Sequence, residues 1–230
     1  MLSYSDWVLI GTSIFLGIVA LFVPYLAELV KRKAFSPKLK IGHRNSPPFS
    51  LHTFWSNRKT PEVREPVYFF RFQIKNDGKS QARRCEAILE TLWLFDASGK
   101  PHLYENFSPV HLRYDEIGTR FVDINPKRKV FWNIGHISSY SYQEQSESNL
   151  FTDVPGDHEN QLRFLFDLLE YPHSQPNCLV PGKYGICIKL YSENAGTKEI
   201  YFQIDWSGNW QSAETDMFRE IVVTKVNKIN

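Results

Sequence analysis

An uninterrupted apolar stretch near the N-terminus, residues 7–27, decides the topology of this chain. Its 21 residues include no Asp, Glu, Lys, Arg or His. At about 1.5 Å of rise per residue, a helix of this length crosses the hydrocarbon core of a bilayer, which is about 30 Å thick. The sequence therefore predicts a single transmembrane helix, with most of the 230-residue chain following it.

A cleaved signal peptide is the competing interpretation of the same stretch. Signal peptides begin with a positively charged segment, have a short apolar core and end in small residues at the cleavage site. Residues 1–6 contain no Lys or Arg, and the long apolar run ends in Glu-Leu-Val-Lys-Arg-Lys, residues 28–33. We therefore expect residues 1–33 to form an uncleaved anchor with a basic flank.

Basic residues close to the apolar stretch gather on one side of it. Asp6 is the only charged residue that precedes the stretch. The positive-inside rule then predicts an N-terminus outside the cell and a cytoplasmic C-terminal domain. We also expect the basic residues that follow the stretch to contact lipid headgroups at the membrane surface. They are Lys31, Arg32, Lys33, Lys38 and Lys40.

The charge pattern divides the rest of the chain. Residues 31–61 carry eight basic side chains and no acidic one, whereas residues 62–230 carry 19 basic and 23 acidic side chains. Because Pro, Ser and Asn interrupt the basic segment, we predict a juxtamembrane linker with a first strand over residues 34–65, and a folded domain over residues 66–230. In the domain, residues 138–161 form a long acidic loop whose role the sequence leaves open.

Apolar residues alternate with polar residues along much of the domain, which is the period of half-buried strands. Residues 84–95 fit either a strand or a helix, and their pattern favours the strand. A turn between two of the alternating runs predicts a hairpin. Strands are expected over residues 67–75, 120–124, 128–137, 183–191, 199–206 and 221–226, and a short helix over residues 212–219.

Many short strands with polar turns, and no helices alternating with them, predict an antiparallel β-sandwich. Residues 72–78, with Ala82 after them, resemble the strand and turn of bacterial immunoglobulin-like modules of the CARDB type. The Pro-Gly-Lys-Tyr sequence of residues 181–184 is similar to the start of strand F in such sandwiches. The resemblance implies an immunoglobulin-like sandwich and supplies no catalytic residues. Those modules are mostly extracellular, which conflicts with the orientation that the basic flank predicts.

No catalytic, nucleotide-binding or metal-binding motif stands out. The sequence has no GxGxxG, GxxxxGK, GxSxG or HExxH pattern. Its cysteines, Cys85, Cys178 and Cys187, are odd in number and lack CxxC spacing, which is typical of a reducing compartment. We therefore expect no enzymatic activity, no cofactor and no metal, with an unrecognised hydrolase as the weakest alternative.

Three short stretches are candidate ligand sites. Two indole rings surround a tight turn, where they form either core or a stacking platform. Three successive cations on another turn are either a solvated tip or a phosphate site. Two basic residues in the aromatic part of the basic segment belong either to a solvated linker or to a phosphate-binding surface. The candidate ligand-binding residues are Arg58, Lys59, Lys127, Arg128, Lys129, Trp206 and Trp210.

These features predict a membrane-anchored cytoplasmic binding or scaffolding module without catalytic activity. Its expected partners are membrane lipid and another protein, and no nucleic acid is expected. The alternative is a membrane effector whose domain senses a nucleotide-type ligand and whose helix forms a homo-oligomer. Ser13 and Gly17 form a small-xxx-small pair, which lets two helices approach closely.

Overall fold

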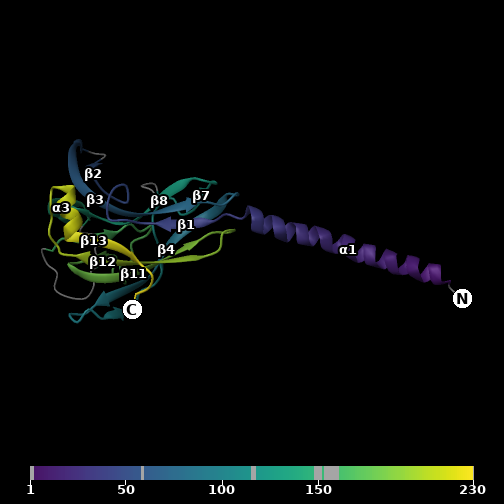
Figure 1. Ribbon diagram of the computed structural model, residues 1–230. Coiled ribbons are helices and arrows are strands. Elements are labelled where there is room, and N and C mark those ends of the chain that lie inside the picture. The colour runs from purple at the N-terminus through teal and green to yellow at the C-terminus, as the bar shows by residue number, and fades with distance from the viewer. Residues whose placement is uncertain (1–2, 58–59, 115–117, 148–151, 153–160, 230) are drawn as a thin grey trace.

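One long helix precedes two packed β-sheets (Figure 1). This computed structural model describes residues 3–57, 60–114, 118–147, 152 and 161–229. The helix leaves the sandwich at one end, beside the first residues of β1 and β4. The opposite end, which carries α3, is called the far end below.

The helix α1 (Tyr4–Phe35) includes the predicted apolar stretch. Its segment Gly11–Glu28 has a mean hydropathy of 1.6, and the segment is not buried against the sheets. Large apolar side chains such as Phe15, Leu21 and Phe22 are exposed along it. A helix that is apolar all round and has no protein cover is suited to lipid rather than water. The helix α1 is long and apolar enough to cross a membrane.

The first sheet is built around β3, which is long enough to pair with two strands in succession along one side. Near the helix, β1 pairs with the end of β3, and at the far end β2 pairs with its beginning. The strand order is β1-β3-β8-β9-β10, with β2 also beside β3, and all pairs are antiparallel. The strands are β1 (Leu39–Gly42), β2 (Ser50–Asn57), β3 (Thr60–Asn76), β8 (Lys129–Ser138), β9 (Phe164–Phe166) and β10 (Cys178–Leu179).

The second sheet has the order β13-β12-β11-β4-β5, and the short strands β6 and β7 also pair with β4. Its strands are β4 (Ala82–Phe95), β5 (Pro101–Leu103), β6 (Val110–His111), β7 (Val122–Ile124), β11 (Gly182–Tyr191), β12 (Lys198–Trp206) and β13 (Ile221–Val226). The remaining elements are α2 (Tyr140–Tyr142), the π-helical turn η1 (Gln143–Glu147) and α3 (Glu214–Glu220).

The core lies between the two sheets. Alternate residues of β3 point inward, so Phe70 and Phe72 are fully buried. From the second sheet, Leu89, Ile186 and Phe202 belong to the same buried cluster. The chain is therefore mainly β, a sandwich of two antiparallel sheets that follows one apolar helix, as the sequence predicts.

The strands with clear alternation lie where they are expected. Residues 84–95 are strand, as part of β4, so the choice of strand over helix is confirmed. The predicted hairpin is β11 and β12, paired with Ile186 opposite Phe202. The predicted short helix is α3, and β13 follows it directly.

Residues 34–65, predicted as a linker with a first strand, contain two complete strands and the beginning of β3. The helix α1 extends to Phe35, and two strands of the first sheet, β1 and β2, follow within this segment. The strand β1 has only four residues, which is too short for a period to be recognised. In β2, apolar residues occupy both faces, with Leu51 and Trp55 on one and Phe54 on the other, so the alternation that marks a strand is missing.

Candidate functional site

A groove lined by aromatic and arginine side chains crosses the outer face of the first sheet. The strand register places Leu51 opposite Phe69 and Arg71 opposite Asn133, all on the face that points away from the core. The segment after β6 adds one wall. The groove has a volume of about 320 Å³. We call it the outer groove, and its lining is Leu51, Thr53, Trp55, Phe69, Arg71, Arg113, Tyr114, Phe131 and Asn133.

Arg71 supplies a half-buried positive charge in the outer groove. Its guanidinium lies over the Phe131 ring, with 4.9 Å from Cζ to the ring centroid, and its Nη2 donates a hydrogen bond to the Pro48 carbonyl. Burial lowers the pKa of Arg71, although an arginine stays charged at neutral pH. Within the described residues, its buried Nε has no hydrogen-bond partner and no carboxylate lies within ion-pair distance of it.

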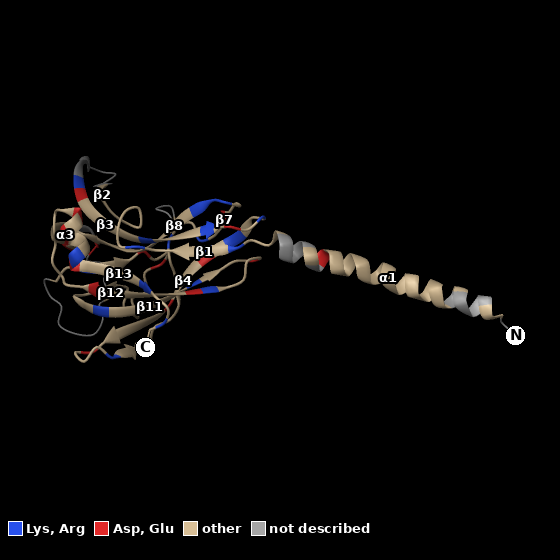
Figure 2. Ribbon diagram, viewed as in Figure 1, with Lys and Arg blue, Asp and Glu red and all other residues tan. Residues whose placement is uncertain are grey.

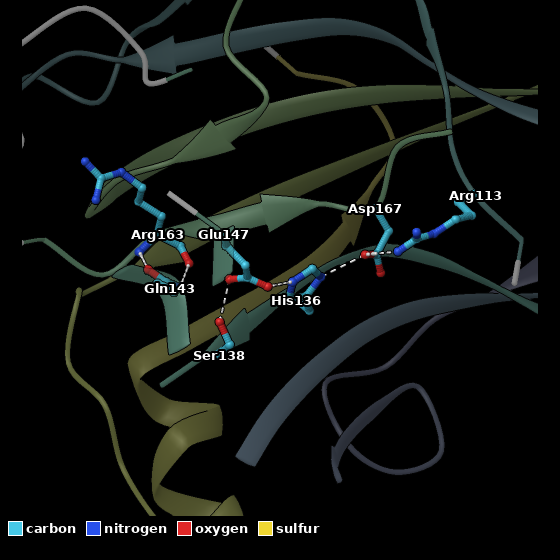
Figure 3. A network of polar contacts seen from close by, with 7 residues as sticks. All are labelled: Arg113, His136, Ser138, Gln143, Glu147, Arg163 and Asp167. Atoms are coloured by element: carbon cyan, nitrogen blue, oxygen red, sulfur yellow. Dashed lines mark hydrogen bonds and ion pairs between the residues drawn. The ribbon is translucent and has the colours of Figure 1, made fainter. Parts of the chain in front are cut away.

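A buried polar network (Figure 3) lies beside the outer groove, because the β3–β8 register places His136 opposite Phe69. The His136 ring binds a carboxylate at each nitrogen: Nδ1 lies 2.7 Å from Asp167 Oδ1, and Nε2 lies 3.0 Å from Glu147 Oε1. The Ser138 hydroxyl donates to the other Glu147 oxygen over 2.6 Å. The side chain of His136 is only 1% exposed. We call these four residues and Arg113 the His136 network.

The charges of the His136 network balance. Burial lowers the pKa of His136, but Asp167 and Glu147 more than offset this effect, and the pKa is raised to about 9. Both ring nitrogens then carry protons at neutral pH and donate to the carboxylates. Arg113 adds a second cation, with Nη2 3.5 Å from Asp167 Oδ1. Two cations thus face two carboxylates, which is the condition for burying charges at tolerable cost.

The His136 network holds three residues of the outer groove. Trp55 packs edge-on against the His136 ring, with 4.6 Å between ring centroids. Phe69 lies 5.5 Å from the same ring. Arg113 lines the groove and reaches Asp167 from there. The groove is therefore held from one side by the buried His136 network.

A second contact holds η1, which carries Glu147, against the start of β9. The Gln143 side chain accepts a hydrogen bond from the backbone amide of Arg163 over 3.0 Å. It also donates to the carbonyl of Arg163 over 2.7 Å (Figure 3). This two-point contact fixes η1 and so keeps Glu147 beside His136.

The His136 network does not present a nucleophile to solvent. A serine, a histidine and carboxylates are the groups of a nucleophile and base pair. In this geometry the Ser138 hydroxyl donates to Glu147 and not to His136. Ser138, Glu147 and Asp167 are also buried. The network therefore positions other residues, and the groups that can meet a ligand lie in the outer groove.

The predicted ligand residues do not converge on this groove. Arg58 and Lys59 lie outside the described residues. Lys127 and Arg128 are exposed between β7 and β8, and Lys129 is exposed at the start of β8, at the end nearest α1. Trp206 is 3% exposed and belongs to the core, which is the other interpretation of the two indoles. Trp210 is half-buried and packs on Tyr68, with 5.2 Å between ring centroids.

The predicted membrane-surface residues lie where α1 meets the sandwich. Lys31, Arg32 and Lys33 are in the last part of α1. Lys38 and Lys40 are exposed, and Lys40 forms an ion pair with Asp77 over 2.9 Å.

One feature of the sequence indicates the outer groove, although it is not among the predicted ligand sites. Phe69 and Phe131 fall on the strand faces that otherwise carry polar residues such as Gln73. Aromatic residues on an outward face often mark a binding surface. His136, Glu147 and Asp167 gave no such signal, because three separate segments bring them together.

No protein-family model matches the chain, and no curated protein matches it either. The resemblance to CARDB-type modules in residues 72–78 and 181–184 therefore stays a prediction. The geometry of the outer groove and the position of α1 are the observations that bear on function.

Proposed function

We propose that this protein is a membrane-anchored, non-enzymatic binding module whose cytoplasmic domain holds an acidic segment of a partner protein in the outer groove. The observation that carries the proposal is Arg71. Its guanidinium is half-buried on an outer sheet face and, in the described part of the chain, has no carboxylate partner. A buried charge without a counter-ion is costly, so a ligand carboxylate improves the energy of the site.

The other groove residues favour apolar contact beside that charge. Trp55, Phe69, Tyr114 and Phe131 are half-buried and line the groove. Trp, Tyr and Arg are the residues that most often dominate the binding energy of protein interfaces. A volume of about 320 Å³ accommodates a few side chains. The preferred ligand is thus an acidic residue flanked by apolar ones.

The His136 network supports this binding by keeping the groove in one conformation. Trp55 and Phe69 pack on His136, and Arg113 is paired with Asp167. Side chains that are already ordered lose little entropy when a ligand binds.

The position of the domain rests on α1 and its charges. The basic residues that follow the apolar segment favour a cytoplasmic domain under the positive-inside rule. The cysteines Cys85, Cys178 and Cys187 are buried and form no disulfide in the described residues, which fits a reducing compartment.

A nucleotide-type ligand is the second candidate. It is favoured by the flat rings of Trp55 and Phe69 close to Arg71, since bases stack on aromatic rings and phosphates pair with guanidinium groups. In that case the protein is a sensor, and its helix forms a homo-oligomer through Ser13 and Gly17.

Binding of a peptide array and of a nucleotide panel by the full-length protein in mild detergent tests both candidates. We expect peptides with Asp or Glu beside apolar residues to bind, and Arg71→Gln to weaken them about tenfold or more. The matched control is Arg219→Gln, which removes an exposed arginine of α3. Binding of nucleotides alone supports the sensor. Equal losses in R71Q and R219Q contradict a site in the outer groove.

A further inference from the structure

The turn after β3 packs against the short segment that joins α1 to β1. Only three residues separate Phe35, the last residue of α1, from the start of β1. The Asp77 amide donates to the Lys38 carbonyl over 2.8 Å, and the Lys38 amide donates to Asn76 Oδ1 over 3.1 Å. A Cβ added at Gly78 would lie 2.5 Å from the carbonyl oxygen of Ser36. This end of the sandwich is therefore held at the point where α1 leaves it.

Two turns at this end carry mainly basic residues (Figure 2). Residues 75–84, which run from the end of β3 to the start of β4, include four basic residues and one acidic residue. Residues 123–129, which run from β7 to the first residue of β8, include three basic residues and one acidic residue. The turn between β11 and β12, residues 192–197, adds only Glu193. We call the seven cations the basic rim: Lys75, Lys79, Arg83, Arg84, Lys127, Arg128 and Lys129.

A row of lysines crosses three strands of the first sheet at this end. Lys40 of β1 lies opposite Lys75 of β3, and Lys75 lies opposite Lys129 of β8. Like charges directly opposite one another destabilise a sheet. Asp77 offsets part of this repulsion, because its carboxylate binds both Lys40 and Lys75, at 2.9 and 2.6 Å. The row still carries more positive than negative charge.

Most of the basic rim is open to a ligand. Six of its members are exposed, Lys75 being the exception. Among the residues that the structure describes, Arg83, Arg128 and Lys129 have no carboxylate within ion-pair distance. The guanidinium of Arg84 lies over the Phe121 ring, 4.0 Å from its centroid, and this contact leaves its charge uncompensated.

The far end carries both signs of charge. Residues 205–220, which include α3, contain four acidic residues and one basic residue. Arg64 of β3 and Lys183 of β11 lie at the same end, so basic and acidic side chains are mixed there (Figure 2). An anionic surface beside the helix therefore attracts the basic rim more strongly than it attracts the far end, which favours one orientation of the domain.

We infer that the basic rim docks on the anionic phospholipid headgroups of the leaflet that α1 enters. The inference rests on the proposed membrane anchoring and extends it from the flank of the helix to a face of the folded domain. The helix places the rim beside the bilayer, so the attraction acts within the Debye length of about 8 Å. In this orientation, the strand ends that carry the basic rim face the membrane surface.

Headgroup quenching in reconstituted vesicles tests this docking. The full-length protein carries Ser80→Cys with a fluorescent label, since the native cysteines are buried. Vesicles contain nitroxide-headgroup lipid in phosphatidylcholine, with or without phosphatidylglycerol. We expect phosphatidylglycerol to increase the quenching and added salt to reverse the increase.

The rim variant combines Lys127→Gln, Arg128→Gln and Lys129→Gln, and it should lose most of the lipid-dependent increase. Each basic residue removed near an anionic leaflet weakens the attraction roughly fivefold. The matched control removes three exposed cations elsewhere, with Lys100→Gln, Lys183→Gln and Arg219→Gln, and should behave as the parent. Unchanged melting of both variants confirms that they fold.

The remaining outcomes contradict the inference in distinguishable ways. If the protein does not co-float with neutral vesicles in a density gradient, both the membrane anchoring by α1 and the docking of the basic rim are contradicted. Protein that inserts but shows no phosphatidylglycerol-dependent quenching contradicts the rim alone, as does an equal loss in the control variant. The protein in neutral vesicles can also be tested with a DNA or RNA oligonucleotide. If it binds the oligonucleotide and the rim variant does not, the basic rim is a nucleic-acid site and the lipid inference is contradicted.

Discussion

His136 makes stability depend on pH. Its pKa is about 9 in the folded protein, against 6.5 for an ordinary histidine, so the folded state holds the proton more tightly than the unfolded state. The resulting stabilisation is complete below about pH 6.5 and is lost as the pH rises to about 9. We expect the free energy of unfolding to fall by about 3 kcal/mol over this range. Urea unfolding of the full-length protein in detergent, at a series of pH values, measures the decrease.

The variant His136→Gln identifies the group responsible. Without the imidazolium, the dependence of stability on pH between 6.5 and 9 should flatten, because no proton is released there. His102→Gln is the control, since His102 is exposed and pairs with Asp96 at the surface. A pH dependence that survives in H136Q is incompatible with the His136 network as described.

Removing one carboxylate of the His136 network should lower the free energy of unfolding, because the charges of the network then no longer balance. Asp167→Asn leaves two cations facing a single carboxylate, and breaking a buried ion pair costs about 3 kcal/mol or more. We also expect weaker ligand binding, because Arg113 loses the partner that holds it in the outer groove. Urea unfolding and peptide binding measure the two effects. The control is Glu170→Gln, at an exposed position three residues away, which should leave stability and binding unchanged. A loss of unfolding free energy in D167N no larger than in E170Q contradicts the His136 network.

At the scale of single elements, β8 and β9 approach each other closely at Gly135. A Cβ added there would lie against the Leu165 carbonyl oxygen and 2.6 Å from the Phe164 ring. Gly135→Ala should therefore push β9 away and destabilise the protein by about 1–3 kcal/mol, measured by urea unfolding. Gly42→Ala is the control, because its nearest neighbour is the Phe49 ring at 3.9 Å. Equal stability of G135A and G42A contradicts this packing.

The sequence predicts a strand well when the alternation of apolar and polar residues continues over many residues and one face of the strand is buried. The strand β12 alternates between buried and half-buried residues from Ile200 onward, β11 has Tyr184, Ile186, Ile188 and Leu190 buried at every second position, and β4 has a burial pattern that follows its apolar residues. In residues 34–65 the sequence predicts a linker with one strand, and it does not resolve β1 from β2, because the first is short and the second is apolar on both faces. Pairing with β3 stabilises them, and that contact depends on residues distant in the sequence.

The residues of the candidate site were harder to predict than the elements. Arg71 lies in the predicted strand 67–75, whose period of two places it on the face opposite Phe70 and Phe72, and the structure has it on that outward face. Its lack of a carboxylate partner within the described residues depends on what the neighbouring strands place beside it. The pairing of His136 with Glu147 and Asp167 depends on η1 and on the residue after β9, which have no spacing rule in the sequence.

At the scale of the whole molecule, the proposed orientation predicts the outcome of protease treatment. Protease added to intact cells should leave the sandwich domain uncut, and the same protease should digest it after the membrane is permeabilised. Replacing Lys31, Arg32 and Lys33 with Gln should give a mixture of orientations, since these charges follow the span most closely. Immunoblots of a C-terminal tag read both results. Digestion of the domain from outside in the unmodified protein contradicts the cytoplasmic assignment.

The proposed function joins an apolar helix, a sandwich with a basic rim beside that helix, and a groove that offers an arginine beside aromatic rings. Photo-crosslinking in cells tests it most directly, with a photoreactive residue in place of Thr53 inside the outer groove. We predict a crosslinked protein adduct at the membrane that Arg71→Gln abolishes and Arg219→Gln retains. The absence of any adduct, or an adduct that forms equally well in R71Q, would contradict a partner bound in the outer groove.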